Sequence, residues 1–135
     1  MKVFISHAST DTELARRVAD SLKEAGLQVW DGSDVLPGDN WAAEAGHALQ
    51  ESNAMVVLLT PESLRAPNVS HEIGYALGKE EYRGRLIPVL AGAPEDLPQH
   101  EIPWVLKRFG MIELSDAKHD EEGLRKIAEA LTQAA

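Results

Sequence analysis

Five short runs of hydrophobic residues recur along the chain, separated by longer stretches in which hydrophobic positions follow a helical spacing. The runs predict β-strands over residues 3–5, 27–30, 54–59, 86–90 and 111–114. The first, third and fourth runs are continuous rather than alternating, which is typical of strands covered on both faces of their sheet.

The stretches between these runs predict four helices, over residues 11–25, 41–52, 69–80 and 120–133. In the first helix, Thr10 and Glu13 predict a capping box and Gly26 predicts the stop. In the third helix, Ile73 and Leu77 fall on one stripe, which we expect to face the sheet.

Strands that alternate with helices predict an α/β fold with right-handed crossovers. We expect a five-stranded parallel doubly wound sheet in the flavodoxin-like order 2-1-3-4-5, with helices on both faces. The crossover over residues 91–108 contains three prolines and should be mostly loop, with one short helix. No linker or repeat divides the chain, so we expect one domain over residues 1–135.

Charge and composition narrow the range of partners. The 135 residues carry a net charge of −9, which disfavours nucleic acid and anionic membrane surfaces as partners. An anionic small ligand stays possible, because backbone amides can supply local positive potential. There are no cysteines, no apolar signal segment follows Met1 and Lys2, and the run at 54–59 is too short to span a bilayer. We therefore expect a cytoplasmic protein.

Three polar segments, 6–11, 31–41 and 60–72, follow the first three predicted strands. Ligands of such sheets bind beyond the carboxyl ends of the strands, so function is expected here. The stretch "HEIGY" has Tyr75 where a zinc protease needs its second histidine, and "DGSDVLPGD" leads to Ala42 where a calcium loop needs glutamate. The sequence therefore predicts no metal site and no bound cofactor.

In this order, the segments resemble the Toll/interleukin-1 receptor (TIR) domain family, in its bacterial-type form. The resemblance rests on "VFISHASTD", "VWDGSDVLPGDNW", "VVLLTPESL" and "NVSHEIGYAL", and it extends from about residue 2 to the last helix. The enzymes of the family cleave the nicotinamide–ribose bond of NAD⁺, and other members are non-catalytic adaptors. By position, the family's catalytic glutamate falls on Glu72.

The chemistry of NAD⁺ is compatible with a single carboxylate at residue 72. Nicotinamide leaves as a neutral molecule, so no general acid is needed and one carboxylate can stabilise the oxocarbenium-like transition state. We expect Asn68, Glu72 and Tyr75 to share one helix face, with Glu72 at the rim of a cleft whose floor is Ser6 and His7. A glutamate is also favoured in the first turn of any helix, which is the alternative reading of Glu72.

Asn68 departs from the family pattern, because many catalytic members have tryptophan four residues before the glutamate. Asparagine can hydrogen-bond a carboxamide or a ribose hydroxyl, but it cannot stack, and it can also cap the helix. Trp30, Trp41 and Tyr75 are the nearby aromatic residues that could replace the missing ring.

The remaining candidate residues follow the first two strands. Ser6, His7 and Ala8 offer backbone amides to phosphate or ribose, or form a structural turn. Asp31 resembles a ribose-contacting acid, or starts an Asx turn. The resemblance assigns an interaction loop to Leu36, Pro37 and Gly38, which in the family touches a neighbouring subunit.

The resemblance therefore implies an NAD⁺ nucleosidase that releases nicotinamide and yields ADP-ribose or a cyclic isomer, in defence or cell-death signalling. Self-association should raise its activity, as the resemblance implies. The alternatives are a non-catalytic adaptor that assembles through residues 31–41, and a nucleoside-processing enzyme such as a deoxyribosyltransferase.

Overall fold

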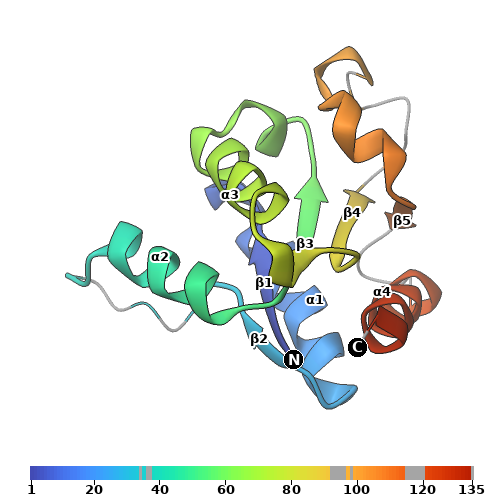
Figure 1. Cartoon of the computed structure of the whole chain (residues 1–135), viewed down its shortest axis with the longest axis horizontal. Helices are drawn as coiled ribbons and strands as arrows, with labels where there is room; N and C mark the ends of the chain where they lie inside the picture. Colours follow the sequence, from blue (N-terminus) through green and yellow to red (C-terminus); the bar gives the residue numbers. More distant parts are fainter. Residues whose placement is uncertain (34, 36–37, 92–96, 98, 115–120, 135) are drawn as a thin grey trace.

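A five-stranded parallel sheet forms the centre of the molecule in the computed structural model, which describes residues 1–33, 35, 38–91, 97, 99–114 and 121–134. The strand order is β2-β1-β3-β4-β5 (Figure 1), so the predicted topology is confirmed. The strands are β1 (Lys2–Ser6), β2 (Gln28–Trp30), β3 (Ala54–Leu59), β4 (Leu86–Ala91) and β5 (Ile112–Leu114).

Within the described residues, four α-helices accompany the sheet, and all four lie within about three residues of their predicted bounds. They are α1 (Thr12–Glu24), α2 (Trp41–Glu51), α3 (Pro67–Leu77) and α4 (Glu121–Ala134). The crossover between β4 and β5 contains two short 3-10 helices in its described part, Gln99–Glu101 and Trp104–Arg108, where one short helix was predicted. Within the described ranges, no helix is both long and apolar enough to cross a membrane.

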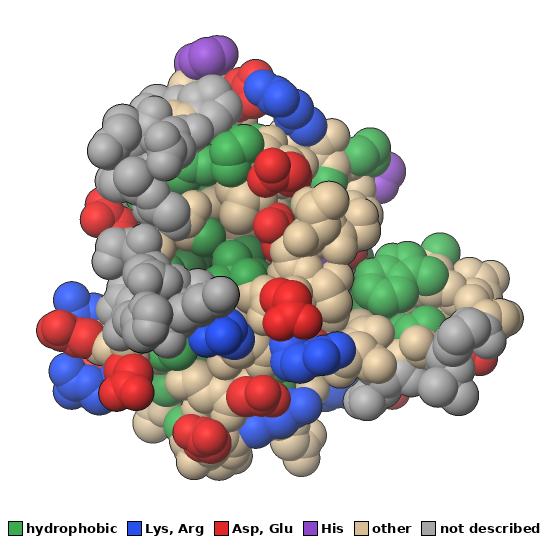
Figure 2. All heavy atoms as spheres, turned by 180° about the vertical axis from the view of Figure 1, so that it is seen from behind, with side chains coloured by type: hydrophobic (Ala, Val, Ile, Leu, Met, Phe, Trp, Pro, Cys, Tyr) green, Lys and Arg blue, Asp and Glu red, His purple; other side chains and the backbone are tan. Residues whose placement is uncertain are grey.

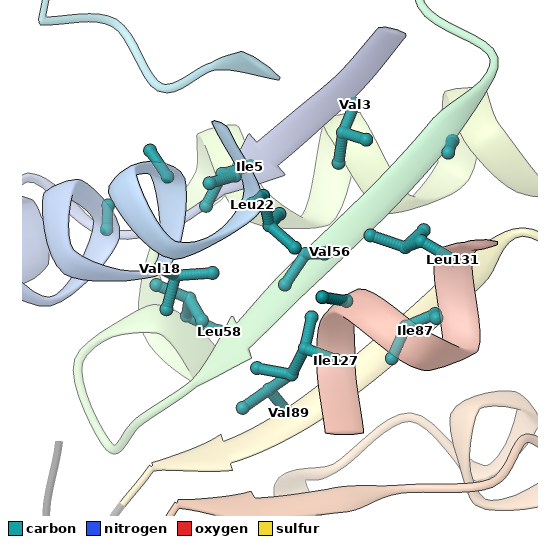
Figure 3. Close-up of a cluster of buried hydrophobic side chains, with 14 of the residues drawn as sticks. Val3, Ile5, Val18, Leu22, Val56, Leu58, Ile87, Val89, Ile127 and Leu131 are labelled. Carbon is teal, nitrogen blue, oxygen red and sulfur yellow. The ribbon is translucent and has the colours of Figure 1, made fainter. Parts of the chain in front are cut away.

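Each face of the sheet has its own hydrophobic core. On one face, strand residues such as Val3, Val56 and Val89 pack against α1 and α4 (Figure 3). On the other face, Phe4 and Met55 belong to a second core that includes residues of α2 and α3. All six residues of β3 are buried, because its alternate side chains enter the two cores. The continuous hydrophobic run at 54–59 follows from this position.

The two ends of α1 differ in how well the sequence predicted them. Gly26 has a φ of +91°, and its N–H donates to the Lys23 carbonyl, while the Leu27 N–H donates to the Leu22 carbonyl. This is a Schellman stop, as predicted. The predicted capping box of Thr10 and Glu13 is wrong, because a 3-10 turn over Ser9–Asp11 precedes the helix.

A contact distant in sequence explains the missing box. Asp11 is the N-cap residue of α1, but its side chain makes no capping hydrogen bond. Its Oδ2 instead accepts a hydrogen bond of 2.6 Å from the Thr60 hydroxyl, beyond the end of β3. This bond ties the start of α1 to the segment that leads into α3.

The prediction that Leu77 faces the sheet is also wrong. The buried stripe of α3 consists of Val69, Glu72, Ile73 and Ala76. Leu77, the last helical residue, lies beside this stripe and is 44% exposed. It lines a surface pocket of about 360 Å³ near the start of β4 rather than the core.

Candidate functional site

Glu72 is buried against the end of β1 rather than lying at a rim, which corrects the predicted position. Its side chain is 6% exposed, because residue 72 belongs to the stripe of α3 that faces the sheet. The hydroxyl of Ser6, the last residue of β1, donates a 2.7 Å hydrogen bond to Glu72 Oε1. Ser6 is itself fully buried, so the pair fixes the carboxylate at the carboxyl end of the central strands.

The surroundings of Glu72 act on its ionisation in opposite directions. Burial is the larger effect and raises the pKa of Glu72 above its ordinary value of 4.5, because a low-dielectric environment disfavours the charged form. Hydrogen bonds from Ser6 and Asn68, and the nearby charge of His71, favour the carboxylate and offset part of the rise in the pKa. The result is a carboxylate that is costly to bury but held by specific donors.

Asn68 lies in the first turn of α3 and connects Glu72 to the first strand's loop. The helix begins at Pro67 and its N-cap residue is Ala66, so Asn68 does not cap it. Its Nδ2 donates a 3.3 Å hydrogen bond to the His7 carbonyl oxygen, and its side chain favours the charged form of Glu72. Because the His7 carbonyl only accepts, the amide nitrogen must face it.

His7 is the next residue after β1, and its ring is held by its own strand. The ring Nδ1 lies 3.1 Å from the Ile5 carbonyl oxygen, and the side chain is largely buried. A carbonyl oxygen can only accept, so Nδ1 carries a proton. Ala8 is buried beside it, and its carbonyl accepts from the Asp11 N–H.

A pocket of about 310 Å³ opens beside these residues. It is lined by His7, Ser9, Thr12, Trp41 and Asn68. Glu72 does not line it but lies buried one helical turn beyond Asn68. The structure therefore brings together four predicted site residues, since His7, Asn68 and Trp41 meet at the pocket and Glu72 lies behind it.

Trp41 reaches the pocket from the first residue of α2, and a short aromatic series supports it. Asn40 caps this helix by accepting from the Ala43 N–H. The Trp41 ring lies 5.5 Å from that of Trp30, which stacks on the buried Phe4 ring at 4.9 Å. Trp41 remains 43% exposed, so it offers an aromatic surface close to the position where the family's tryptophan is absent.

Asp31 adopts the turn that the sequence left as its alternative reading. Its Oδ1 accepts hydrogen bonds from both the backbone N–H and the hydroxyl of Ser33, at 3.0 and 2.7 Å. Gly32 between them has a φ of +86°, and a Cβ there would overlap the Trp41 ring. The turn therefore shapes the approach of β2 to α2, and a ribose contact by Asp31 stays a prediction.

Tyr75 lies apart from the pocket. Its ring meets Tyr82 edge-on at a centroid distance of 6.3 Å, and the Lys79 ammonium lies 5.4 Å from the ring. Of the predicted interaction loop, Leu36 and Pro37 lie outside the described residues. Gly38 is exposed and has a φ of +95°, a left-handed conformation that favours glycine.

Sequence reasoning missed two groups of supporting residues. Ser63 and Thr60 exchange hydrogen bonds in the segment after β3, which positions the start of α3. At the other end of α2, the Tyr82 hydroxyl donates to the Leu49 carbonyl at 2.8 Å and Lys79 Nζ donates to the Gln50 carbonyl. The stretch "TPES" gives a turn signal for the first group, whereas no local sequence pattern predicts the second group.

The described residues contain no group of three or more His, Asp and Glu side chains placed to hold a metal ion. The site that they do form is a buried carboxylate with two donors, next to a small pocket with one aromatic wall. Such an arrangement can stabilise positive charge that develops on a bound substrate.

Solved structures of known proteins share this fold. A metazoan TIR-STING receptor from C. gigas, in complex with 2′,3′-cGAMP, matches with a TM-score of 0.76 and 26% identity over 96% of this chain. The chain spans 38% of that receptor's length. The TIR domain of the Toll-related receptor TRR-2 from Hydra magnipapillata matches with a TM-score of 0.73 and 20% identity, covering 96% of this chain and 97% of that one.

A third match is the CMP N-glycosidase BcmB of Clostridium botulinum, with a TM-score of 0.55 and 22% identity, covering 94% of this chain and 97% of that one. No curated protein matches the chain. The sequence model of the TIR domain matches residues 3–128, nearly the whole chain. Together with the sheet order, this match shows that the chain belongs to the TIR domain family.

Proposed function

We propose that this TIR domain is an NAD⁺ nucleosidase in which Glu72 is the catalytic carboxylate. The observation that carries the proposal is the buried Glu72 side chain, held by Ser6 and Asn68 at the carboxyl end of β1. A carboxylate is expensive to bury, and a structural role alone would be served as well by an apolar residue. Perturbed carboxylates of this kind concentrate at functional sites.

The reaction breaks the bond between ribose C1′ and the pyridinium nitrogen. The bonding electron pair passes to the ring nitrogen, which becomes neutral, and C1′ develops oxocarbenium character. Glu72 stabilises that positive charge, and its carboxylate is poised to do so by the donors that hold it. Water then adds to C1′ and loses a proton to give ADP-ribose, or a nitrogen of the adenine ring adds to give a cyclic isomer.

Self-association is part of the proposal. The first turn of α2 is exposed and includes Trp41, Ala42 and Ala43, and α2 extends away from the body of the molecule (Figure 1). Viewed from behind, the projecting helix α2 carries hydrophobic side chains on its surface (Figure 2). A neighbouring copy that covers α2 would also close the pocket beside Trp41, so activity should rise with protein concentration.

The same surface supports the second candidate function, a non-catalytic adaptor that binds other TIR domains through residues 31–41. Exposed hydrophobic residues next to each other on a projecting element are typical of interaction sites. On this reading, Glu72 stabilises the end of β1 and has no substrate.

The test is product analysis by chromatography after incubation with NAD⁺, at low and at high protein concentration. CMP is included as a second substrate, because BcmB has the same fold and is a CMP N-glycosidase. Glu72→Gln is the inactive control, and Glu24→Gln, an exposed residue at the end of α1, is the matched control. Nicotinamide from wild type and Glu24→Gln but not from Glu72→Gln supports the proposal, and the second product separates hydrolase from cyclase.

Survival of NAD⁺ with an assembled protein would contradict the nucleosidase and favour the adaptor. Release of cytosine from CMP, with NAD⁺ intact, would instead favour a nucleotide N-glycosidase that uses the same carboxylate.

A further inference from the structure

The pocket beside Trp41 is lined by donors as well as acceptors, since the Trp41 indole N–H and the Ser9 hydroxyl can donate. Its acceptors begin with His7. Because Nδ1 donates to the Ile5 carbonyl, the neutral ring has its lone pair on Nε2. Among the described residues, Nε2 neither has a hydrogen-bond partner nor is enclosed. Since His7 lines the pocket, the ring offers an acceptor to whatever enters it.

Asn68 adds a second acceptor. Its amide nitrogen donates to the His7 carbonyl, which fixes the nitrogen side of the amide towards that carbonyl. The amide oxygen accepts no hydrogen bond from the described residues and is the group left for a ligand. The Thr12 hydroxyl donates to the Ser9 carbonyl at 2.8 Å, so its oxygen is also left as an acceptor.

No lysine or arginine lines this pocket in the part of the chain that the structure describes. The Glu72 carboxylate, buried one helical turn beyond Asn68, adds negative potential. A ligand group with N–H donors and positive charge is favoured beside His7 Nε2 and Asn68 Oδ1, and a carboxylate there is disfavoured because it would face these two acceptors and the like charge of Glu72.

We propose that His7 is a specificity-determining residue, whose Nε2 accepts a hydrogen bond from the carboxamide N–H of the leaving pyridinium ring. Asn68 Oδ1 is the second acceptor for the same amide, and the Trp41 ring lies at the pocket wall. This inference rests on the proposed nucleosidase function. It assigns the substrate class as dinucleotides whose cationic ring bears a carboxamide, and it excludes those whose ring bears a carboxylate.

The experiment compares NAD⁺ with nicotinic acid adenine dinucleotide, which has a carboxylate in place of the carboxamide. Wild type should prefer NAD⁺ by about tenfold or more in kcat/KM, the value of one hydrogen bond exchanged for an unfavourable contact. His7→Leu removes the acceptor and should reduce the preference to about twofold or less. His47→Leu, which changes an exposed histidine of α2, should leave the preference unchanged.

Equal turnover of the two dinucleotides by wild type, or an unchanged preference in His7→Leu, would overturn the assignment. A binding measurement covers the case in which neither dinucleotide is cleaved or His7→Leu does not fold. Wild type is titrated with nicotinamide and with nicotinate while the ¹⁵N resonances of the His7 ring are followed. A shift of Nε2 with nicotinamide alone supports the inference, whereas no shift, or the same shift with both, overturns it. Failure of cleavage with a selective shift would reject the nucleosidase and keep the recognition site.

Discussion

Replacing Ser6 with alanine tests whether the hydroxyl stabilises the charged form of Glu72. The substitution removes one oxygen from a fully buried position and leaves the strand pairing of β1 in place. At 2.7 Å, the O–H···O distance lies in the range of charge-assisted hydrogen bonds, which contribute about 1.5–3 kcal/mol. At neutral pH, we therefore expect Ser6→Ala to lower the free energy of unfolding by about 2 kcal/mol.

The sign of the pH dependence follows from the same bond. The Ser6 donor favours the carboxylate, so its removal raises the pKa of Glu72 further. As the pH falls through the raised pKa of Glu72, the carboxylate is protonated in both proteins and only a neutral hydrogen bond is lost, worth about 1 kcal/mol. The cost of the substitution should therefore shrink towards acid pH, and the acid limb of any NAD⁺ turnover should move towards neutrality.

Urea unfolding at about pH 7.5 and at an acid pH below the raised pKa of Glu72 measures both effects, with the m-value as a check on two-state behaviour. Ser70→Ala, which changes an exposed serine of the same helix α3, should alter stability by less than about 0.5 kcal/mol at either pH. In a Glu72→Gln background, the cost of Ser6→Ala should lose its pH dependence. A cost that is equal at both pH values in the wild-type background would refute the reasoning.

Urea unfolding also tests three further substitutions, at Glu72, Gly32 and Tyr82. Glu72→Gln should raise stability at neutral pH by about 0.5–2 kcal/mol, and this gain should vanish as the pH falls through the raised pKa of Glu72, because the neutral acid no longer carries a buried charge. Gly32→Ala should cost about 1–2 kcal/mol and lower NAD⁺ turnover, because the positive φ becomes strained and the Trp41 ring must move. Tyr82→Phe should cost about 1 kcal/mol, because the Leu49 carbonyl at the end of α2 loses its 2.8 Å donor.

Each of these three predictions has an outcome that would contradict it. No stabilisation by Glu72→Gln at neutral pH would show that burying the carboxylate costs little. Gly46→Ala is the control for Gly32→Ala, because a Cβ at Gly46 meets no atom within 4 Å and the helix should gain about 0.5–1 kcal/mol. Equal stability of Tyr82→Phe and wild type would mean that the hydroxyl does not hold α2.

The sheet was predictable because its strands have a local signature. The uninterrupted run at 54–59 identifies a strand buried on both faces, and the helices between the runs require parallel pairing. The stop of α1 was also predictable, since Gly26 acts through its own backbone. The start of α1 was not predictable, because the Asp11 side chain accepts a hydrogen bond from Thr60. These residues are 49 positions apart, so no local sequence pattern encodes their contact.

The candidate site was only partly predictable from the sequence, because Ser9 and Thr12 line the pocket but were not among the predicted site residues. The resemblance directed attention to Glu72, and helical spacing placed Asn68 on the same face. The depth of the carboxylate was missed, because a glutamate in a helical pattern reads as an exposed position. Only the packing of α3 against β1 shows that residue 72 belongs to the buried stripe and that Ser6 is its donor. Tyr75 was expected on that face, yet Lys79 and Tyr82 lie close to its ring instead.

The most direct test of the central claim is the initial rate of nicotinamide release from NAD⁺, measured for wild type, Glu72→Gln and Glu24→Gln at a protein concentration that favours assembly. Removal of one electrostatic stabiliser from a catalytic site lowers turnover by about 10²–10³-fold. The account predicts a loss of this size in Glu72→Gln alone, in a protein that unfolds at least as cooperatively as wild type. Turnover that persists in Glu72→Gln, or that is absent from assembled wild type, would contradict it.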